Sequence, residues 1–266
     1  MARLWAPLVL SLALVVAGCS GFAGGPAEDR TTVAPGAVPT TTDRADGRYV
    51  APGVTAEGLV DPGALQRAHT TQLANASHTF RERVTRRDAN GTILSQYTTV
   101  VRRNGSAVRY RYVRRATAAA TSLRIDSWAD GQRVYTARTE GNATTYSVED
   151  TVATARRVPL GPSDYGASLG RVFGLLSVDV AGTDRENGSV RYRLTTTRVR
   201  DVPPLENVRF EGTVTPEGVL AEYRISYRVR RNGEPVDVTV RVTVDDIGTT
   251  AVERPPWYER AVSETE

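Results

Sequence analysis

Strict alternation of apolar and polar residues near the C-terminus limits the folds available to this chain. In residues 219–230 and 236–245, every second residue is apolar or aromatic, and most of those between are charged or carry hydroxyls. A period of two places the apolar side chains on one face of a β-strand. The Asn232-Gly233 pair between the two runs favours a tight turn. These residues predict a long hairpin with one apolar and one charged face.

The same period of two recurs through most of the chain after residue 76. Short turn signals, including Asn90-Gly91, Asn104-Gly105 and Asp130-Gly131, separate several of the segments. We expect further strands at residues 77–87, 92–103, 106–114, 121–129, 132–139, 144–149, 177–183, 189–200 and 208–215.

Two segments have helical spacing instead. Asp61 precedes Pro62, which suits the first helical turn, and small or apolar residues follow at helical spacing to about Asn75. A second such stretch lies within residues 163–176. We therefore expect a mainly β (α+β) fold, a curved antiparallel sheet or half-barrel of about 10–11 strands, with one or two short helices covering its apolar face. A closed barrel is the alternative, because closure removes exposed edge strands.

The first nineteen residues predict export and a lipid anchor. Arg3 precedes an apolar run over residues 8–17, which ends in Ala17-Gly18-Cys19. About ten apolar residues are too few to span a bilayer but have the length of an export signal. Cys19 is the single cysteine of the chain and stands where a lipoprotein signal requires one. We expect residues 1–18 to be a signal peptide and Cys19 to be lipidated; an ordinary secretory signal is the alternative.

Residues 19–48 differ in composition from the rest of the chain. They are rich in Thr, Pro and Gly and contain almost no large apolar side chains. Such a segment does not bury enough surface to offset the entropy of ordering it, so we expect a disordered tether. Residues 49–266 are expected to form a single β-rich domain. The expected location is the outer, extracellular face of the cell membrane.

Short motifs link this chain to a family. They are Tyr49, Pro52-Gly53-Val54, Asp61, Leu65, His69, Leu73, Ser77 and the closing Pro256-Trp257-Tyr258. With the lipid signal and the tether, they resemble an uncharacterised lipoprotein family of halophilic archaea. That family is similar to the half-barrel lipoprotein carriers and to the lipid-binding lipoproteins of mycobacteria. The resemblance implies a curved antiparallel sheet that closes over helices and encloses an apolar cavity.

Candidate catalytic and metal-binding residues are few. Residues 166–170 match the Gly-x-Ser-x-Gly elbow of serine hydrolases, which needs a strand before it and a histidine after it. No histidine follows His78, so we do not expect a hydrolase. His69 and His78, without cysteine or clustered carboxylates, form a poor metal site. We interpret them as a helix-face and a strand-start histidine, and we predict no enzyme activity, cofactor or metal.

Charged residues often occur in pairs at predicted strand ends or turns. These pairs are Glu149-Asp150, Asp245-Asp246, Arg102-Arg103, Arg114-Arg115 and Arg230-Arg231. The chain has no lysine, so its 34 basic residues other than histidine are all arginine. Its formal net charge is +4. Arginine is suited to phosphate, but tyrosines on the opposite strand face argue against a stacked nucleic-acid platform. We interpret the arginines as solvated strand faces and predict no nucleic-acid partner.

Five Asn-x-Ser/Thr sequons are candidates for N-glycosylation. Their asparagines are Asn75, Asn90, Asn104, Asn142 and Asn187. Several coincide with predicted turns, where turn geometry alone accounts for asparagine. On an exported protein we expect one or two of them to carry a glycan.

Two functions remain open. In the first, the apolar sheet face binds or carries a lipid or another apolar ligand, and Tyr110, Tyr112, Tyr223, Ile225 and Tyr227 line it. The same residues would equally well be core, packed against the helices. In the second, the domain is a structural or interaction protein of the cell envelope, with no ligand cavity. Its partner would then be the cell-wall layer or another envelope protein.

Overall fold

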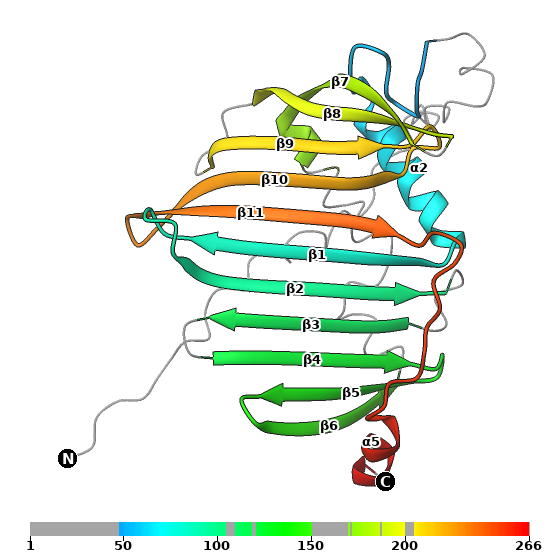
Figure 1. Cartoon of the computed structure of the whole chain (residues 1–266), viewed down its shortest axis with the longest axis vertical. Coiled ribbons are helices and arrows are strands. Elements are labelled where there is room, and N and C mark those ends of the chain that lie inside the picture. Colours follow the sequence, from blue (N-terminus) through cyan, green and yellow to red (C-terminus); the bar gives the residue numbers. More distant parts are fainter. Residues whose placement is uncertain are drawn as a thin grey trace, which may run out of the picture. The chain divides into compact units, whose positions relative to one another are not determined.

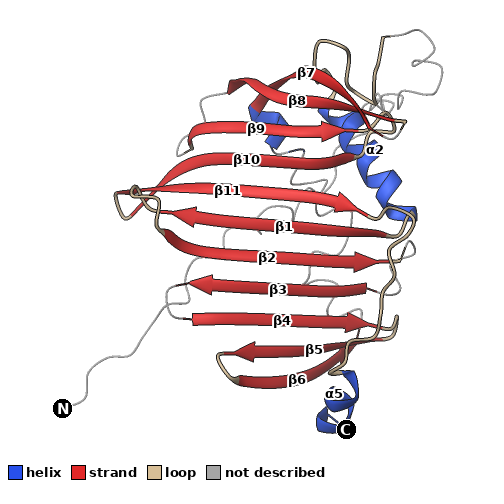
Figure 2. Ribbon diagram, viewed as in Figure 1, coloured by secondary structure: helices blue, strands red, loops and turns tan. Residues whose placement is uncertain are grey.

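The computed structural model describes residues 48–104, 110–118, 121–150, 170, 172–186, 188–199 and 205–265. The elements in chain order are α2 (Pro62–Asn75), β1 (His78–Arg87), β2 (Ile93–Arg103), β3 (Tyr110–Ala118), β4 (Thr121–Ala129), β5 (Arg133–Glu140), β6 (Ala143–Asp150), β7 (Leu176–Glu186), β8 (Ser189–Val199), β9 (Glu206–Val214), β10 (Leu220–Arg231), β11 (Glu234–Asp245) and α5 (Tyr258–Thr265). Strands dominate the described residues (Figure 2).

All of these strands belong to one sheet of eleven strands (Figure 1). Their order is β6-β5-β4-β3-β2-β1-β11-β10-β9-β8-β7, and every neighbouring pair is antiparallel. The sheet is open, with β6 and β7 as its edges, so the closed-barrel alternative is not what forms. The expected mainly β fold, a curved sheet or half-barrel with short helices, is confirmed.

The pairing of β1 with β11 joins the two halves of the sheet. Strands β1 to β6 and strands β7 to β11 each run as a meander in which every strand pairs with the next in sequence. Thr79 lies opposite Asp245 and Arg87 lies opposite Asp237, so the pair stays in register over the length of β1. The long predicted hairpin thereby occupies the middle of the sheet.

The turn between β10 and β11 has the conformation that its residues favour. Asn232 and Gly233 both have positive φ angles, 53° and 84°. Two consecutive positive φ angles define the tight hairpin turn whose twist matches that of the strands, and Asn-Gly adopts it at little cost. The predicted hairpin is therefore confirmed at its turn as well as in its strands.

The N-terminal helix begins and ends where the sequence predicts. The Asp61 carboxylate accepts a hydrogen bond of 2.9 Å from the Ala64 amide, and Pro62 occupies the first turn. The segment before the helix packs closely on its start. A Cβ added to Gly53, whose φ is +74°, would lie 2.1 Å from the Asp61 carbonyl oxygen, so only glycine fits there.

Helix α2 covers one end of the apolar sheet face. Leu65 and Leu73 of α2 belong to a main apolar cluster with residues from most strands, among them Phe80, Phe210 and Val242. Full burial of such side chains stabilises the fold by about 1.5–3 kcal/mol each.

The C-terminal helix covers the other face, which the sequence did not predict. Trp128 lies opposite Tyr135 across β4 and β5, while its neighbour Ala129 belongs to the main cluster on the α2 side. Side chains alternate between faces along a strand, so Trp128 and Tyr135 project from the face opposite α2. There they pack with Ala261 of α5. The polar sheet face is therefore covered by α5 at this edge.

Most other element boundaries agree with the sequence to within a few residues. One difference concerns β3, which continues to Ala118, so Arg114-Arg115 lie inside this strand and not at its end as predicted. Residues 172–175 are helical, as expected from the spacing in that region, and β7 begins at Leu176.

Candidate functional site

The apolar sheet face is closely packed around Phe210 of β9, beneath Phe173. This ring is 1% exposed and makes an edge contact with Phe173 at 5.2 Å between centroids and a stacked contact with Tyr223 at 6.1 Å. Gly212 makes room for the stack, because a Cβ there would lie 2.9 Å from the Phe210 ring and 3.1 Å from the Tyr223 Cβ. This end of the face is core.

A second apolar cluster lies further along the same face. We call it the valine–tyrosine cluster: Val84, Val236 and Val238, with the partly buried Tyr97, Tyr227, Val229 and Val240 packed against them. Neither of the described helices contributes a residue to it. Tyr227 and Val240 also pack against the main cluster, so the apolar face is continuous from one cluster to the other.

His69 of α2 is buried where the helix meets the start of β10. Its Nδ1 accepts a hydrogen bond of 3.2 Å from the backbone amide of Leu220, and the residue is 2% exposed. Burial, and secondarily the nearby His78, lowers the pKa of His69 to about 4. The neutral imidazole is therefore the form that the fold accommodates. This agrees with the interpretation of His69 as a helix-face histidine.

His78 begins β1, also as interpreted from the sequence. Its Nδ1 donates to the Ala76 carbonyl at 3.0 Å, which leaves Nε2 as an acceptor. That atom is buried without a hydrogen-bond partner in the structure. Burial lowers the pKa of His78; the Ala76 hydrogen bond acts in the opposite sense, and the charge of Arg103 lowers the pKa further. His69 thus packs where α2 meets β10, and His78 packs at the α2–β1 junction.

An aromatic cluster holds the C-terminal segment on the opposite face. Tyr258 makes edge contacts with Tyr135 at 4.7 Å and Trp128 at 5.1 Å. The Arg254 guanidinium lies 4.6 Å from the Tyr258 ring centroid, within the range of a cation–π contact. A hydrogen bond with Tyr135, followed by burial, raises the pKa of Tyr258. These contacts make α5 part of the packed domain.

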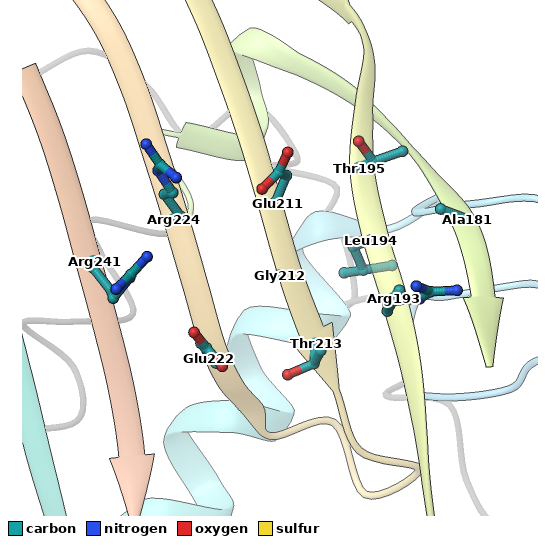
Figure 3. Close-up of a pocket in the computed structure, with 10 residues that line it drawn as sticks. All are labelled: Ala181, Arg193, Leu194, Thr195, Glu211, Gly212, Thr213, Glu222, Arg224 and Arg241. Atoms are coloured by element: carbon teal, nitrogen blue, oxygen red, sulfur yellow. The ribbon is translucent and has the colours of Figure 1, made fainter. Parts of the chain in front are cut away.

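A pocket of about 450 Å³ opens on the polar face, across β7 to β11. Arginine, glutamate and threonine side chains from neighbouring strands dominate it, and α2 passes behind these strands in Figure 3. Its lining residues are Ala181, Arg193, Leu194, Thr195, Glu211, Gly212, Thr213, Glu222, Arg224 and Arg241. The Arg193 guanidinium packs over Gly182 and pairs with Asp184 at 3.5 Å.

Three of the residues expected to line an apolar ligand site lie on the apolar sheet face. Tyr223 and Ile225 are buried in the main cluster, and Tyr227 lies between the two clusters. Burial, together with the charge of Glu82, raises the pKa of Tyr223. Tyr110 and Tyr112 belong to β3, and their side chains are outside the described part of the chain. A ligand on this face stays a prediction.

The expected modification sites lie at turns and element ends where the structure describes them. Asn75 ends α2, Asn104 follows β2, and Asn90 and Asn142 are exposed in the β1–β2 and β5–β6 turns. Asn187 and Cys19 lie outside the described residues, as do the serine of the Gly-x-Ser-x-Gly match and the expected signal and tether. Glycosylation and lipidation are therefore still predictions.

The two acid pairs lie far apart in the sheet. Glu149-Asp150 ends β6 and Asp245 ends β11, several strands away in the sheet order, and Asp246 follows it. Among the described residues, no group of three or more His, Cys, Asp or Glu side chains is arranged to hold a metal ion. No helix in this part of the chain is long and apolar enough to cross a membrane.

Comparisons with known proteins give a low overall similarity. The sequence matches no protein-family model and no curated protein sequence. Among solved structures, LprF from Mycobacterium bovis is similar at 13% identity and a TM-score of 0.37, over 72% of this chain and 96% of LprF. The Pseudomonas aeruginosa MucA/MucB complex matches at 14% identity and 0.31, over 76% of this chain and 60% of that chain. A beta-barrel-like DUF1849 protein from Brucella abortus matches at 11% and 0.20, over 66% and 98%.

These similarities are too low to carry an argument about the fold of this chain. They do not assign a ligand or a partner, and membership of the halophilic archaeal family stays a prediction. The polar-face pocket and the aromatic cluster were both missed from the sequence. In the sequence, Trp257-Tyr258 was noted only as a motif. The signal for the aromatic cluster was the presence of large aromatic residues both in this motif and on the polar face of β4 and β5, at Trp128 and Tyr135.

Proposed function

We propose that the chain is a membrane-anchored protein of the cell surface that binds an apolar ligand, such as a lipid acyl chain, against the valine–tyrosine cluster. The observation that carries this proposal is an apolar face that continues beyond α2 into a cluster without α2 or α5 residues. No catalytic group is part of the proposal.

The composition of the cluster suits an acyl chain. The side chains of Val84, Val236 and Val238 form a floor without polar atoms, and the half-buried Tyr227 leaves ring surface for a ligand. The guanidinium of Arg86 lies 5.9 Å from the Tyr97 ring centroid, so a cation borders the cluster at Tyr97. Covering about ten methylene groups gives about 8 kcal/mol of transfer free energy, and the cost of association and ordering makes the net affinity weaker than the micromolar Kd to which that value alone corresponds. An affinity of this order suits reversible carriage.

Tryptophan placed on either face of β10 tests the site. Tyr227 and Ser226 are neighbours, so they project from opposite faces of the strand. We expect an acyl chain carrying bromine to quench the added fluorescence of Tyr227→Trp and not that of Ser226→Trp. Both variants keep Trp128 and Trp257, so the native emission cancels in the comparison.

The alternative function predicts a different outcome. If the domain is a structural or interaction protein of the envelope with no ligand cavity, the brominated chain quenches both variants equally or neither. Native mass spectrometry of the gently extracted protein then shows a mass without bound lipid. Crosslinking on intact cells would in that case give one stable protein neighbour, whereas a carrier gives transient ones.

The anchor is tested separately by Cys19→Ser. Stable anchoring needs two lipid chains, because one gives only marginal membrane binding. The variant has no thiol to receive lipid, so we expect its release into the medium or the retention of an uncleaved signal. Fractionation followed by immunoblotting measures this, with Ser20→Ala as a neighbouring control that stays in the membrane. Unchanged membrane association of Cys19→Ser would count against lipidation.

A further inference from the structure

Three arginines stand directly opposite one another on the polar sheet face. We call Arg83, Arg241 and Arg224 the arginine row: Arg241 of β11 pairs in register with Arg83 of β1 on one side and with Arg224 of β10 on the other. Directly opposed residues of an antiparallel pair have Cβ atoms roughly 4.5–5.5 Å apart, and like charges at that spacing destabilise the sheet. All three side chains are exposed.

An equivalent row four residues further along the strands is arranged differently. There Asp237 of β11 stands between Arg87 and Arg228. Asp237 accepts hydrogen bonds of 2.7 and 3.1 Å from Arg228, and this contact lowers the pKa of Asp237. The arginine row has a cation in the place of that carboxylate. Within the residues that the structure describes, none of its three guanidiniums is ion-paired.

The row adjoins the polar-face pocket. Arg224 and Arg241 line this pocket, together with Glu211, Glu222 and Thr213 (Figure 3). The three arginines outnumber the two carboxylates, so the local charge is positive. Guanidinium groups bind phosphate and sulfate through paired hydrogen bonds, while carboxylates and threonine hydroxyls accept hydrogen bonds from alcohols. The Thr213 hydroxyl oxygen is buried with no partner in the structure.

We propose that the arginine row and the adjoining pocket bind the phosphate or sulfate ester of a polyol. The oxyanion lies over Arg241 between Arg83 and Arg224, where it supplies the negative charge that Asp237 supplies in the neighbouring row. The hydroxyl groups of the polyol extend into the pocket toward Glu211 and Glu222. This site lies on the face opposite the valine–tyrosine cluster, so it stands or fails independently of the proposed apolar ligand.

Arg241→Asp tests the proposal, because it rebuilds the arrangement seen around Asp237. Calorimetry of the full chain in neutral detergent measures binding of inorganic phosphate, inorganic sulfate and glycerol 3-phosphate. We expect Arg241→Asp to weaken binding of glycerol 3-phosphate at least about tenfold, since it removes charged hydrogen bonds and places a negative charge beside the anion. The thermal midpoint without anions should stay the same or rise, because like-charge repulsion is removed.

The control is Arg228→Gln, on the same strand and the same face as Arg224. It removes one positive charge from a row that already holds its own carboxylate, so we expect less than about a twofold effect on anion affinity, from general electrostatics alone. Equal losses in Arg228→Gln and Arg241→Asp would overturn the proposal. So would wild-type protein that binds none of the three anions and no anionic micelle.

The same detergent distinguishes the two sources of such an ester. Mixed micelles with phosphatidylglycerol present it as a lipid headgroup, and micelles with phosphatidylcholine are the control. Binding to phosphatidylglycerol micelles but not to free glycerol 3-phosphate identifies a headgroup site; binding to both identifies a site for the soluble ester as well. Either outcome supports the proposal if Arg241→Asp weakens that binding at least about tenfold, and a smaller loss overturns it.

Discussion

Phe210→Ala is expected to lower the free energy of unfolding by about 3–5 kcal/mol, the usual cost of removing a buried aromatic ring. The ring is 1% exposed and lies between Phe173 and Tyr223. Its loss leaves a cavity between Phe173 and Tyr223, because the backbone of β9 is held in the sheet by β8 and β10 and is not free to collapse into the space. Urea unfolding measures the effect.

Arg209→Ala is the matched control for this core prediction. Arg209 precedes Phe210 on β9 and is exposed on the opposite face. Exposed substitutions of this kind change stability by about 0.5 kcal/mol or less. A similar fall in the free energy of unfolding in both variants would contradict this prediction. It would show that any substitution in β9 destabilises the domain and that burial of the Phe210 ring is not the cause.

The free energy of unfolding should fall by about 3 kcal/mol between pH 6.5 and pH 4 through His69 alone. Its pKa is lowered to about 4 in the folded protein, from 6.5. Between pH 6.5 and pH 4, His69 is therefore protonated in the unfolded chain and mostly neutral in the folded chain. The stabilisation is complete above about pH 6.5 and is lost as the pH falls toward about 4. Unfolding titrations at several pH values measure the slope.

His69→Asn separates the histidine from the other titrating groups. The Asn side-chain oxygen is placed to accept the Leu220 amide hydrogen bond that Nδ1 accepts in the native protein. Between pH 6.5 and pH 4, the free energy of unfolding of the variant should fall less steeply than that of the native protein. At pH 5 and below, the variant should therefore keep most of the free energy of unfolding that it has at pH 6.5. His78, whose pKa is lowered too, contributes in the same sense in both proteins. Identical slopes would contradict the role given to His69.

Local patterns in the sequence were sufficient for most of the elements. The Asp61-Pro62 start of α2 and the Asn232-Gly233 turn are determined by hydrogen-bonding and φ preferences of adjacent residues, so they could be read without tertiary information. The continuation of β3 past Arg114 could not, because its cross-strand partners in β2 and β4 determine how far it extends.

The candidate sites depended on tertiary structure to different degrees. The residues expected to line an apolar ligand site were chosen because they alternate along their strands. This alternation correctly put Tyr223, Ile225 and Tyr227 on one face. It did not distinguish the core beneath α2 from the valine–tyrosine cluster, since both have the same alternation. The arginines of β1 and β11 were each predicted to be exposed on a strand, but their alignment in one row depends on a pairing between strands about 150 residues apart in the chain.

By itself, the sequence determined an antiparallel, mainly β domain with one strongly apolar face, because side-chain alternation and turn chemistry are local properties. It also predicts an export signal and a lipidated Cys19, which depend on a linear motif. Tertiary structure alone decided the β1–β11 pairing, the position of α5 on the face opposite α2, and the arginine row. The physical reason is that contacts between distant segments determine strand register and helix docking. The spacing of residues along one strand carries no information about those contacts.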